Sequence, residues 1–310
     1  MFVIFHIEKA SVPFSIALAF IAGIASTSQA TLSGHLANEL NDGIMAALIS
    51  NIGGAVCMYL FLFNTRVRNS GKLLISKIRN KQLPLWQLSG GAFGAIYIAT
   101  AASAVSVIGT GLFTVVLVAS QNFSSIVADK VGFGSGIKRK ITPRRLIAAV
   151  LGIIAVLLSV SGFTGKFLWI PIVAIIFAGF AATIQFSING KLTQESTSEM
   201  SAFINFPMSM LIVSCTLLIM KFFGKQWPTW PEQWWMYFAG CLGAVVVFLA
   251  AATIKTLGVL LFGLASVTGS LITSLGIDTF APAANISVGW ALISGAGLMI
   301  FAVYLASELR

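Results

Sequence analysis

Two sets of small and polar residues repeat in the sequence, and each set carries one glutamine. Within each set the spacing is 4-3-4, which places the residues on one face of an α-helix. The sets are Ala22, Ser26, Gln29 and Ser33 and, 156 residues later, Ala178, Ala182, Gln185 and Asn189. Such a stripe fits close packing of helices, with an amide bonding across the interface. It equally fits a small-walled cavity in which two amides hydrogen-bond a polar solute.

Further uncharged polar side chains stand inside apolar segments. An amide without a partner in an apolar medium is costly, so each must face protein or water. We expect the route of a solute to be lined by Gln29, Gln185, Ser26, Asn51, Asn205, Tyr97, Gln121 and Asn122. A structural role is the alternative for each amide, and ordinary core packing is the alternative for Tyr97.

Charged residues avoid the middle of these apolar segments, where a charge would mark a proton or ion pathway. Because an amide does not exchange protons near neutral pH, the sequence argues against carboxylate-driven exchange of cations for protons. Acidic residues at segment ends are the candidates for gating or charge pairing: Asp129, Asp278, Glu39 and Glu195. The alternatives are helix capping, pairing with Lys130 and the basic residues after it, or solvation.

Sets of catalytic or metal-binding residues are missing. His6 and His35 lie outside the apolar segments, and no Ser/His/Asp, paired-carboxylate or metal set can be assembled. The three cysteines lack metal-ligand spacing and are interpreted as small apolar residues, with no disulfide expected. The glycines at 132–136 lack the Lys-Ser/Thr of a phosphate-binding loop. We expect no enzyme activity, no metal and no cofactor.

The composition places these segments in lipid. Of 310 residues, 57% are hydrophobic and 9% are charged, whereas a soluble domain carries about 25% charged residues. The net charge of +10 could suggest nucleic acid, but 12 of the 19 Lys and Arg lie in two stretches, 66–81 and 130–145. Basic stretches between apolar segments are a topogenic signal. The expected partners are therefore a lipid bilayer and a small solute, not a nucleic acid.

The apolar runs have the length of membrane-spanning helices, about 20 residues for a core of ~30 Å. Ten spans are predicted, at 13–34, 44–64, 84–106, 109–129, 143–163, 168–190, 200–222, 233–254, 258–281 and 286–307. The breaks near 106–109 and 255–258 are tight, which predicts two helical hairpins. The fold class is an all-α integral membrane protein.

The distribution of Lys and Arg predicts the orientation. With both basic stretches in the cytoplasm, the inner side holds 16 basic residues and the outer side three, Lys166, Lys221 and Lys225. Both termini then lie in the cytoplasm. The membrane is expected to be the inner membrane of a bacterium.

A second repeated block strengthens the first: residues 86–129 match 235–278 at a shift of 149, including Gly94/Gly243, Phe113/Phe262 and Asp129/Asp278. We expect two repeats, 1–163 and 164–310, of five spans each. Because five is odd, the second repeat enters the membrane inverted, as in many secondary transporters.

These motifs resemble the YdcZ-like branch of the drug/metabolite transporter superfamily. The resemblance rests on Ala-Gly-x-x-x-x-x-Gln at 22–29, on Trp86 with the glycines at 90–94, and on Gln121, Ser125 and Asp129 before a basic stretch. It implies two fused five-helix units forming an inner-membrane transporter, often an exporter. The second half departs from the pattern, since Ser270 stands at the Gln121 position.

We therefore expect a secondary transporter, in the direction of export, that moves a small polar or amphipathic metabolite by alternating access. A channel-like or lipid-handling membrane protein is the alternative. The oligomeric state stays open, with a monomer as one option.

Overall fold

The computed structural model describes most of the chain. The described residues are 11–138, 140, 142–159, 169–224, 226, 230 and 232–280, with 294, 297–298, 300–302 and 304–305 near the C-terminus. Across these ranges the secondary structure is helical, without strands. The predicted span 286–307 lies largely outside them.

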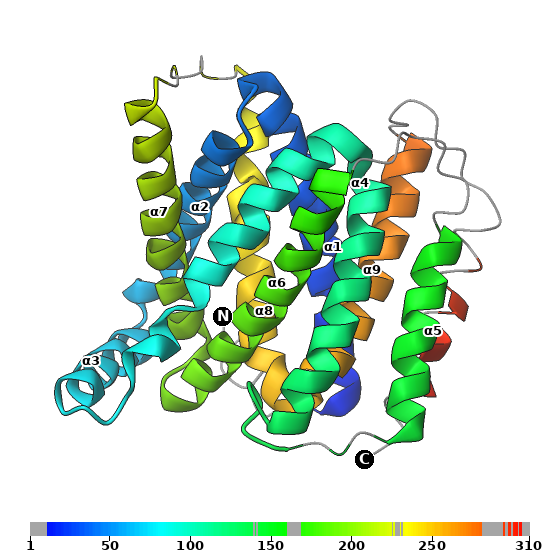
Figure 1. The fold of residues 1–310 in the computed structure, drawn as a ribbon. Helices are drawn as coiled ribbons and strands as arrows, with labels where there is room; N and C mark the ends of the chain where they lie inside the picture. The colour runs from blue at the N-terminus through cyan, green and yellow to red at the C-terminus, as the bar shows by residue number, and fades with distance from the viewer. Residues whose placement is uncertain are drawn as a thin grey trace.

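Long helices form one bundle (Figure 1). They are α1 (Val12–Leu40), α2 (Gly43–Tyr59), α3 (Thr65–Arg79), α4 (Gly90–Val131), α5 (Pro143–Ser159), α6 (Trp169–Glu195), α7 (Ser198–Phe222), α8 (Ala239–Leu257) and α9 (Val259–Phe280). Short 3₁₀ turns continue or precede them at Leu60–Phe63, Leu85–Leu88 and Trp234–Phe238. The helix α1 lies inside the bundle, packed against α2, α4, α8 and α9.

Six of these helical segments are long and apolar enough to cross a membrane. They are Val12–Leu40, Gly43–Phe63, Leu85–Ile108, Trp169–Glu195, Ser198–Phe222 and Trp234–Leu257, which coincide with six of the predicted spans. The predicted spans 109–129, 143–163 and 258–281 correspond to the second part of α4, to α5 and to α9. Large apolar side chains such as Val56 and Phe177 are 60% and 66% exposed, and such a surface suits lipid.

The helix α4 reverses direction within its 42 residues. The rings of Tyr97 and Phe113 lie 6.5 Å apart, whereas 16 residues of straight helix would separate their backbones by about 24 Å. In α6, Gly179 then Thr183 contact Ser120 then Ser124 in the same order. Gly90 and Gly94 instead contact Asn189 and Gln185 in reverse order. The predicted hairpin is therefore present, but helical bonding runs through the break expected near 106–109.

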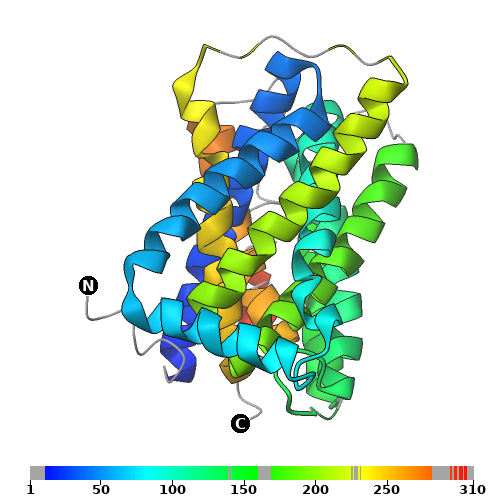
Figure 2. The same ribbon diagram turned by 90° about the vertical axis from the view of Figure 1, so that its left-hand side faces the viewer.

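The first basic stretch lies mostly in a helix, α3 (Thr65–Arg79), which was not predicted from the sequence. Asn64 caps α3 by accepting a hydrogen bond from the backbone N–H of Arg66. Val67 and Leu74 are one face of this helix and are buried against Leu192 and Met200 of α6 and α7. The spacing of Val67 and Leu74 was not recognised in the sequence, because charged residues stand between them. Figure 2 shows α3, in cyan, running crosswise to the bundle helices at one end.

The expectation of no disulfide was also wrong, because Cys57 of α2 and Cys241 of α8 are disulfide-bonded, with their Cα atoms 5.8 Å apart. The two helices can come this close because Gly240 has no side chain. A β-carbon at this position would collide with the backbone carbonyl of Ser50. A separation of 184 residues hid the pairing. Cys215 is a free, exposed cysteine.

Candidate functional site

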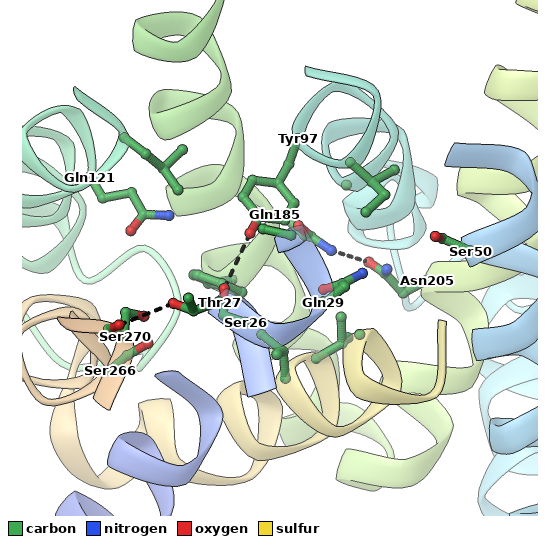
Figure 3. A pocket seen from close by; sticks show the side chains of 18 of the residues that line it. Ser26, Thr27, Gln29, Ser50, Tyr97, Gln121, Gln185, Asn205, Ser266 and Ser270 are labelled. Atoms are coloured by element: carbon green, nitrogen blue, oxygen red, sulfur yellow. Dashed lines mark hydrogen bonds between the residues drawn. The ribbon is translucent and has the colours of Figure 1, made fainter. Parts of the chain in front are cut away.

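A cavity lies between the long helices, and it gathers seven of the eight predicted route residues. They are Gln29, Gln185, Ser26, Asn51, Asn205, Tyr97 and Gln121, of which Figure 3 labels all but Asn51. None of the residues that line it carries a formal charge. Its volume of about 60 Å³ holds only a few water molecules. A typical ligand pocket is about 300 Å³ or more, so in this conformation the site is narrow.

The helix α1 supplies Ser26 and Gln29 from its middle. Small residues on the same helix, Ala22 and Gly23, are buried. A β-carbon on Gly23 would collide with the backbone of Ser266 in α9, so the two backbones touch. The Gln29 side chain is 8% exposed, and among the described residues its amide has no hydrogen-bond partner. It instead abuts Gly243 of α8, whose missing side chain makes room for it. The amide is thus available to a solute.

Gln185 belongs to a buried amide cluster on α6 and α7. The Nε2 of Gln185 donates to Oδ1 of Asn205 at 3.1 Å, and Nδ2 of Asn189 donates to the same oxygen at 3.0 Å. Figure 3 shows Gln29, Gln185 and Asn205 directed into the same space. Because Asn205 already accepts two hydrogen bonds, its amide is oriented, and its own N–H groups remain for the cavity.

The phenol of Tyr97 closes another side of the cavity. Its hydroxyl shares a hydrogen bond of 3.1 Å with the Ser26 hydroxyl, drawn as a dashed line in Figure 3. Its ring packs against Phe113, which also lines the cavity. An aromatic body with a polar tip suits a solute that is partly apolar.

Of the remaining predicted route residues, two line the cavity and one does not. Gln121 and Asn51 line the cavity, and Nδ2 of Asn51 donates to the carbonyl of Ala47 within its own helix. Asn122 does not line it: the side chain is 1% exposed near Gly263 of α9. Adjacent residues on a helix point about 100° apart, and here the rotation of α4 turns Gln121 toward the cavity and Asn122 toward α9.

Several lining residues were not predicted, including hydroxyls and aromatic rings of the second half: Ser266, Ser270, Phe186, Phe206 and Ser209. The equivalence of Gln121 with Ser270 was the available signal, since a cavity shared by two repeats draws on matching positions of both. The aromatic rings could not be predicted, because the neighbouring sequence does not distinguish an aromatic residue that lines a cavity from one in the core.

The three acidic candidates whose side chains are described lie away from the cavity. The carboxylate of Asp129 is buried and accepts from the backbone N–H groups of Val259 (2.7 Å) and Leu260 (3.3 Å), the first turn of α9. Glu195 forms a 2.8 Å ion pair with Lys77 of α3. Glu39, near the end of α1, is exposed, and the Asp278 side chain lies outside the described residues. Within the part of the chain described, no three His, Cys, Asp or Glu residues group as metal ligands.

A tryptophan ring meets a basic or imidazole side chain at both ends of the bundle. Lys191 Nζ stands 5.0 Å from the centre of the Trp86 ring. His35 packs edge-on against Trp235, with ring centres 6.0 Å apart. His35 aligns with Lys191 at the shift of 156, and Trp86 aligns with Trp235 at the shift of 149.

Comparison with known proteins adds a family and a fold. One of 27 matching chains of known structure, titled "Crystal structure of protein", aligns with a TM-score of 0.66. The alignment covers 96% of this chain and 98% of that one at 17% identity, which is evidence of fold alone. No functionally curated protein matches the chain.

A family model described as "Putative inner membrane exporter, YdcZ" matches the chain twice, at residues 14–158 and 170–305. Exporters are transport proteins of the membrane and not a class of enzyme. The two matches cover most of the chain, one in each half, and agree with its apolar membrane-length helices. This chain therefore belongs to the YdcZ family of multi-pass inner-membrane exporters.

Proposed function

We propose that the protein is a secondary carrier that exports a small, uncharged solute by alternating access through the central cavity. The observation that carries the proposal is the cavity lining: amides, hydroxyls and aromatic rings, without a formal charge. Amides donate and accept hydrogen bonds, so they suit a neutral polar group with a partly apolar body. A charged solute would meet no compensating charge there.

The proposal includes two inverted halves, 1–163 and 164–310, with ten spans in all. Matched contacts between the halves support it. Gly94 faces Gln185, and its counterpart Gly243 faces Gln29. A symmetric exchange of this kind is expected when two equivalent units face each other across an axis in the membrane plane.

Hydrogen bonds follow the same relation. Ser33 of α1 shares a 3.1 Å hydrogen bond with Ser50 of α2, and Asn189 of α6 donates to Asn205 of α7 at 3.0 Å. Ser33 matches Asn189 at the shift of 156, and Ser50 lies 155 residues before Asn205. The ring contacts of Trp86 and Trp235 at the two ends of the bundle support the same relation.

Alternating access follows physically from such a pair. Two equivalent halves can pack in two arrangements of similar energy, because each half can adopt the conformation of the other. When the two halves exchange conformations, the cavity opens to the opposite side of the membrane. The protein needs no second copy for this cycle, and its partners are a solute and the bilayer.

The proposed cytoplasmic end is the one that carries α3. The Lys77–Glu195 pair holds the first basic stretch beside the end of α6. The described start of α1 lies at this end, and the end of α1, the helix that carries Glu39, lies at the other (Figure 1). Basic residues collect on the cytoplasmic side of bacterial inner membranes, so the chain termini are placed in the cytoplasm.

Substituted cysteines test this orientation, in a background in which the native cysteines are serines. Cysteines at Asn80 and Glu195 should react with a membrane-impermeant maleimide only in inside-out vesicles, and a cysteine at Glu39 only in right-side-out vesicles. Labelling of positions 80 and 195 from opposite sides would contradict the inverted arrangement.

Transport itself is tested in proteoliposomes. A metabolite profile of cells with and without the gene supplies neutral candidates, and solute counterflow then measures carrier exchange. Gln29→Ala/Gln185→Ala should lose most counterflow at normal membrane levels. Gln82→Ala/Gln226→Ala, the same change at exposed glutamines outside the cavity, is the matched control.

Unchanged counterflow in the Gln29→Ala/Gln185→Ala variant would contradict the role of the cavity. Flux without trans-stimulation would contradict the carrier cycle and indicate a channel.

A further inference from the structure

We propose that the outward face of α3 is a binding site for anionic phospholipid headgroups of the cytoplasmic leaflet. The inference is independent of the transported solute, because α3 does not line the cavity. It rests on three features of this helix: a fixed inner face, a basic stripe on the outer face, and apolar side chains beside that stripe.

The inner face of α3 is fixed to the bundle. Val67 and Leu74 are 1% and 3% exposed, in a cluster with Leu192 and Met200. The neighbouring turn brings Gly71 so close to Met200 that an added β-carbon would stand 2.7 Å from its terminal methyl. These contacts determine which side of α3 faces outward.

The outward side carries a stripe of basic residues. Arg68, Lys72 and Arg79 are exposed. At about 100° per residue they fall within about 40° of one another around the helix axis. The helix α3 lies crosswise to the bundle (Figure 2). Three cations in one row along such a helix suit a plane of headgroups better than a single point charge. Juxtamembrane basic clusters of this kind attract anionic lipid.

Acidic side chains of the protein do not neutralise this stripe within the described residues. Glu195 is paired with Lys77 on the side of the helix toward the bundle. Glu199 is buried in the first turn of α7, where its hydroxyl partner is Ser198, and Asp129 bonds to the start of α9. The stripe therefore keeps its positive field for a ligand outside the protein.

Apolar side chains next to the stripe identify the ligand as lipid. Ile75 is 66% exposed and adjoins the basic row around the helix axis, and Leu73, 53% exposed, lies farther round the exposed side of the helix. Phe63, just before the helix, is 76% exposed. A soluble phosphate or a nucleic acid would leave these side chains in water. The boundary between headgroups and acyl chains accepts both kinds of side chain, as interfacial amphipathic helices show.

Native mass spectrometry of the full-length protein in neutral detergent provides the test. The probes are phosphatidylglycerol and phosphatidylcholine with identical acyl chains, in equal amounts. The unmodified protein should retain phosphatidylglycerol in excess. Arg68→Gln/Lys72→Gln/Arg79→Gln should lose that excess roughly tenfold or more, because each basic residue near the surface contributes separately.

The matched control is Lys130→Gln/Lys138→Gln/Lys140→Gln, which removes the same charge from exposed residues of the second basic stretch. Its phosphatidylglycerol excess should fall much less. Equal losses in the two triple variants would overturn the assignment to α3. Displacement of the lipid by millimolar glycerol phosphate would also overturn it, since a headgroup alone would then suffice.

Three further variants keep the result decisive if the triple variant fails to fold. Arg68→Lys/Arg79→Lys retains the charge and should retain the excess. Lys72→Glu alters one exposed side chain and should reduce it, while an unaltered excess in Lys72→Glu would count against the proposal. Leu73→Ser/Ile75→Ser should weaken retention of both lipids while phosphatidylglycerol remains preferred.

Discussion

Gly94 of α4 lies directly against the side-chain amide of Gln185 of α6. A β-carbon built on Gly94 would stand 2.6 Å from Nε2 of Gln185, closer than atoms in contact can approach. Gly243 of α8 faces the Gln29 amide of α1 in the same manner. The amides of Gln29 and Gln185 are therefore each placed by a glycine, whose missing side chain determines how far the amide extends into the cavity.

A methyl group at position 94 should disturb the cavity. In Gly94→Ala the Gln185 amide must move, which breaks its 3.1 Å hydrogen bond to Asn205. We expect a loss of about 1–3 kcal/mol in stability, with a larger relative loss of counterflow. Thermal unfolding in detergent and transport measure the two effects.

The control for this prediction is Gly276→Ala, where an added β-carbon meets no atom within 4 Å. In the background of Gln185→Ala, the cost of Gly94→Ala should shrink, since the obstructing amide is gone. Additive costs in this double-mutant cycle would show that the two residues do not interact.

Removing the Asn205 side chain should cost more stability than removing the Gln29 side chain. Asn205→Ala leaves two buried donors, Gln185 Nε2 and Asn189 Nδ2, without their acceptor. Each unpaired donor costs about 1–3 kcal/mol unless water replaces the acceptor. Gln29→Ala breaks no hydrogen bond among the described residues and creates only space. Thermal unfolding of both variants decides, and equal melting temperatures would contradict the prediction.

The carboxylate of Asp129 should stabilise the turn between α8 and α9. Asp129→Ala removes the acceptor of two N–H groups at the start of α9 and a negative charge near that helix's positive end. A lost cap of this kind costs about 1 kcal/mol. The stability of Asp129→Asn should lie between that of the unmodified protein and that of Asp129→Ala, because asparagine keeps an acceptor oxygen but not the charge. Lys130→Gln, at the exposed neighbour, should leave the melting temperature unchanged.

Counterflow of a neutral solute should vary little between pH 6 and pH 8. The cavity lining contains no Asp, Glu, His, Lys or Arg, so none of the side chains that usually titrate in or near this range contacts the solute. Counterflow at equal internal and external pH is the measurement, with right-side-out orientation controlled. A steep dependence on pH would indicate that a group outside the cavity takes part in the cycle.

Residue type and order were enough to predict the surroundings of the chain and much of its site. Long apolar runs and sparse charge predict helices in lipid, because each residue's transfer into the bilayer depends mainly on that residue and on its position along the run. The cavity residues Gln29 and Gln185 were recognisable for a similar reason: an amide in an apolar run is costly, and it occurred twice in one pattern.

Tertiary structure decided how these residues meet. The spacing that identified Gln121 and Asn122 could not say which of them faces the cavity, because that depends on the rotation of α4 against α6 and α9. The helix α3 owes its inner face to Met200 and Leu192, more than a hundred residues away. The disulfide between Cys57 and Cys241 likewise depends on the close approach of α2 and α8 at Gly240. Hydropathy is local, whereas contacts between helices depend on the shape of both partners, and that shape exists only in the folded chain.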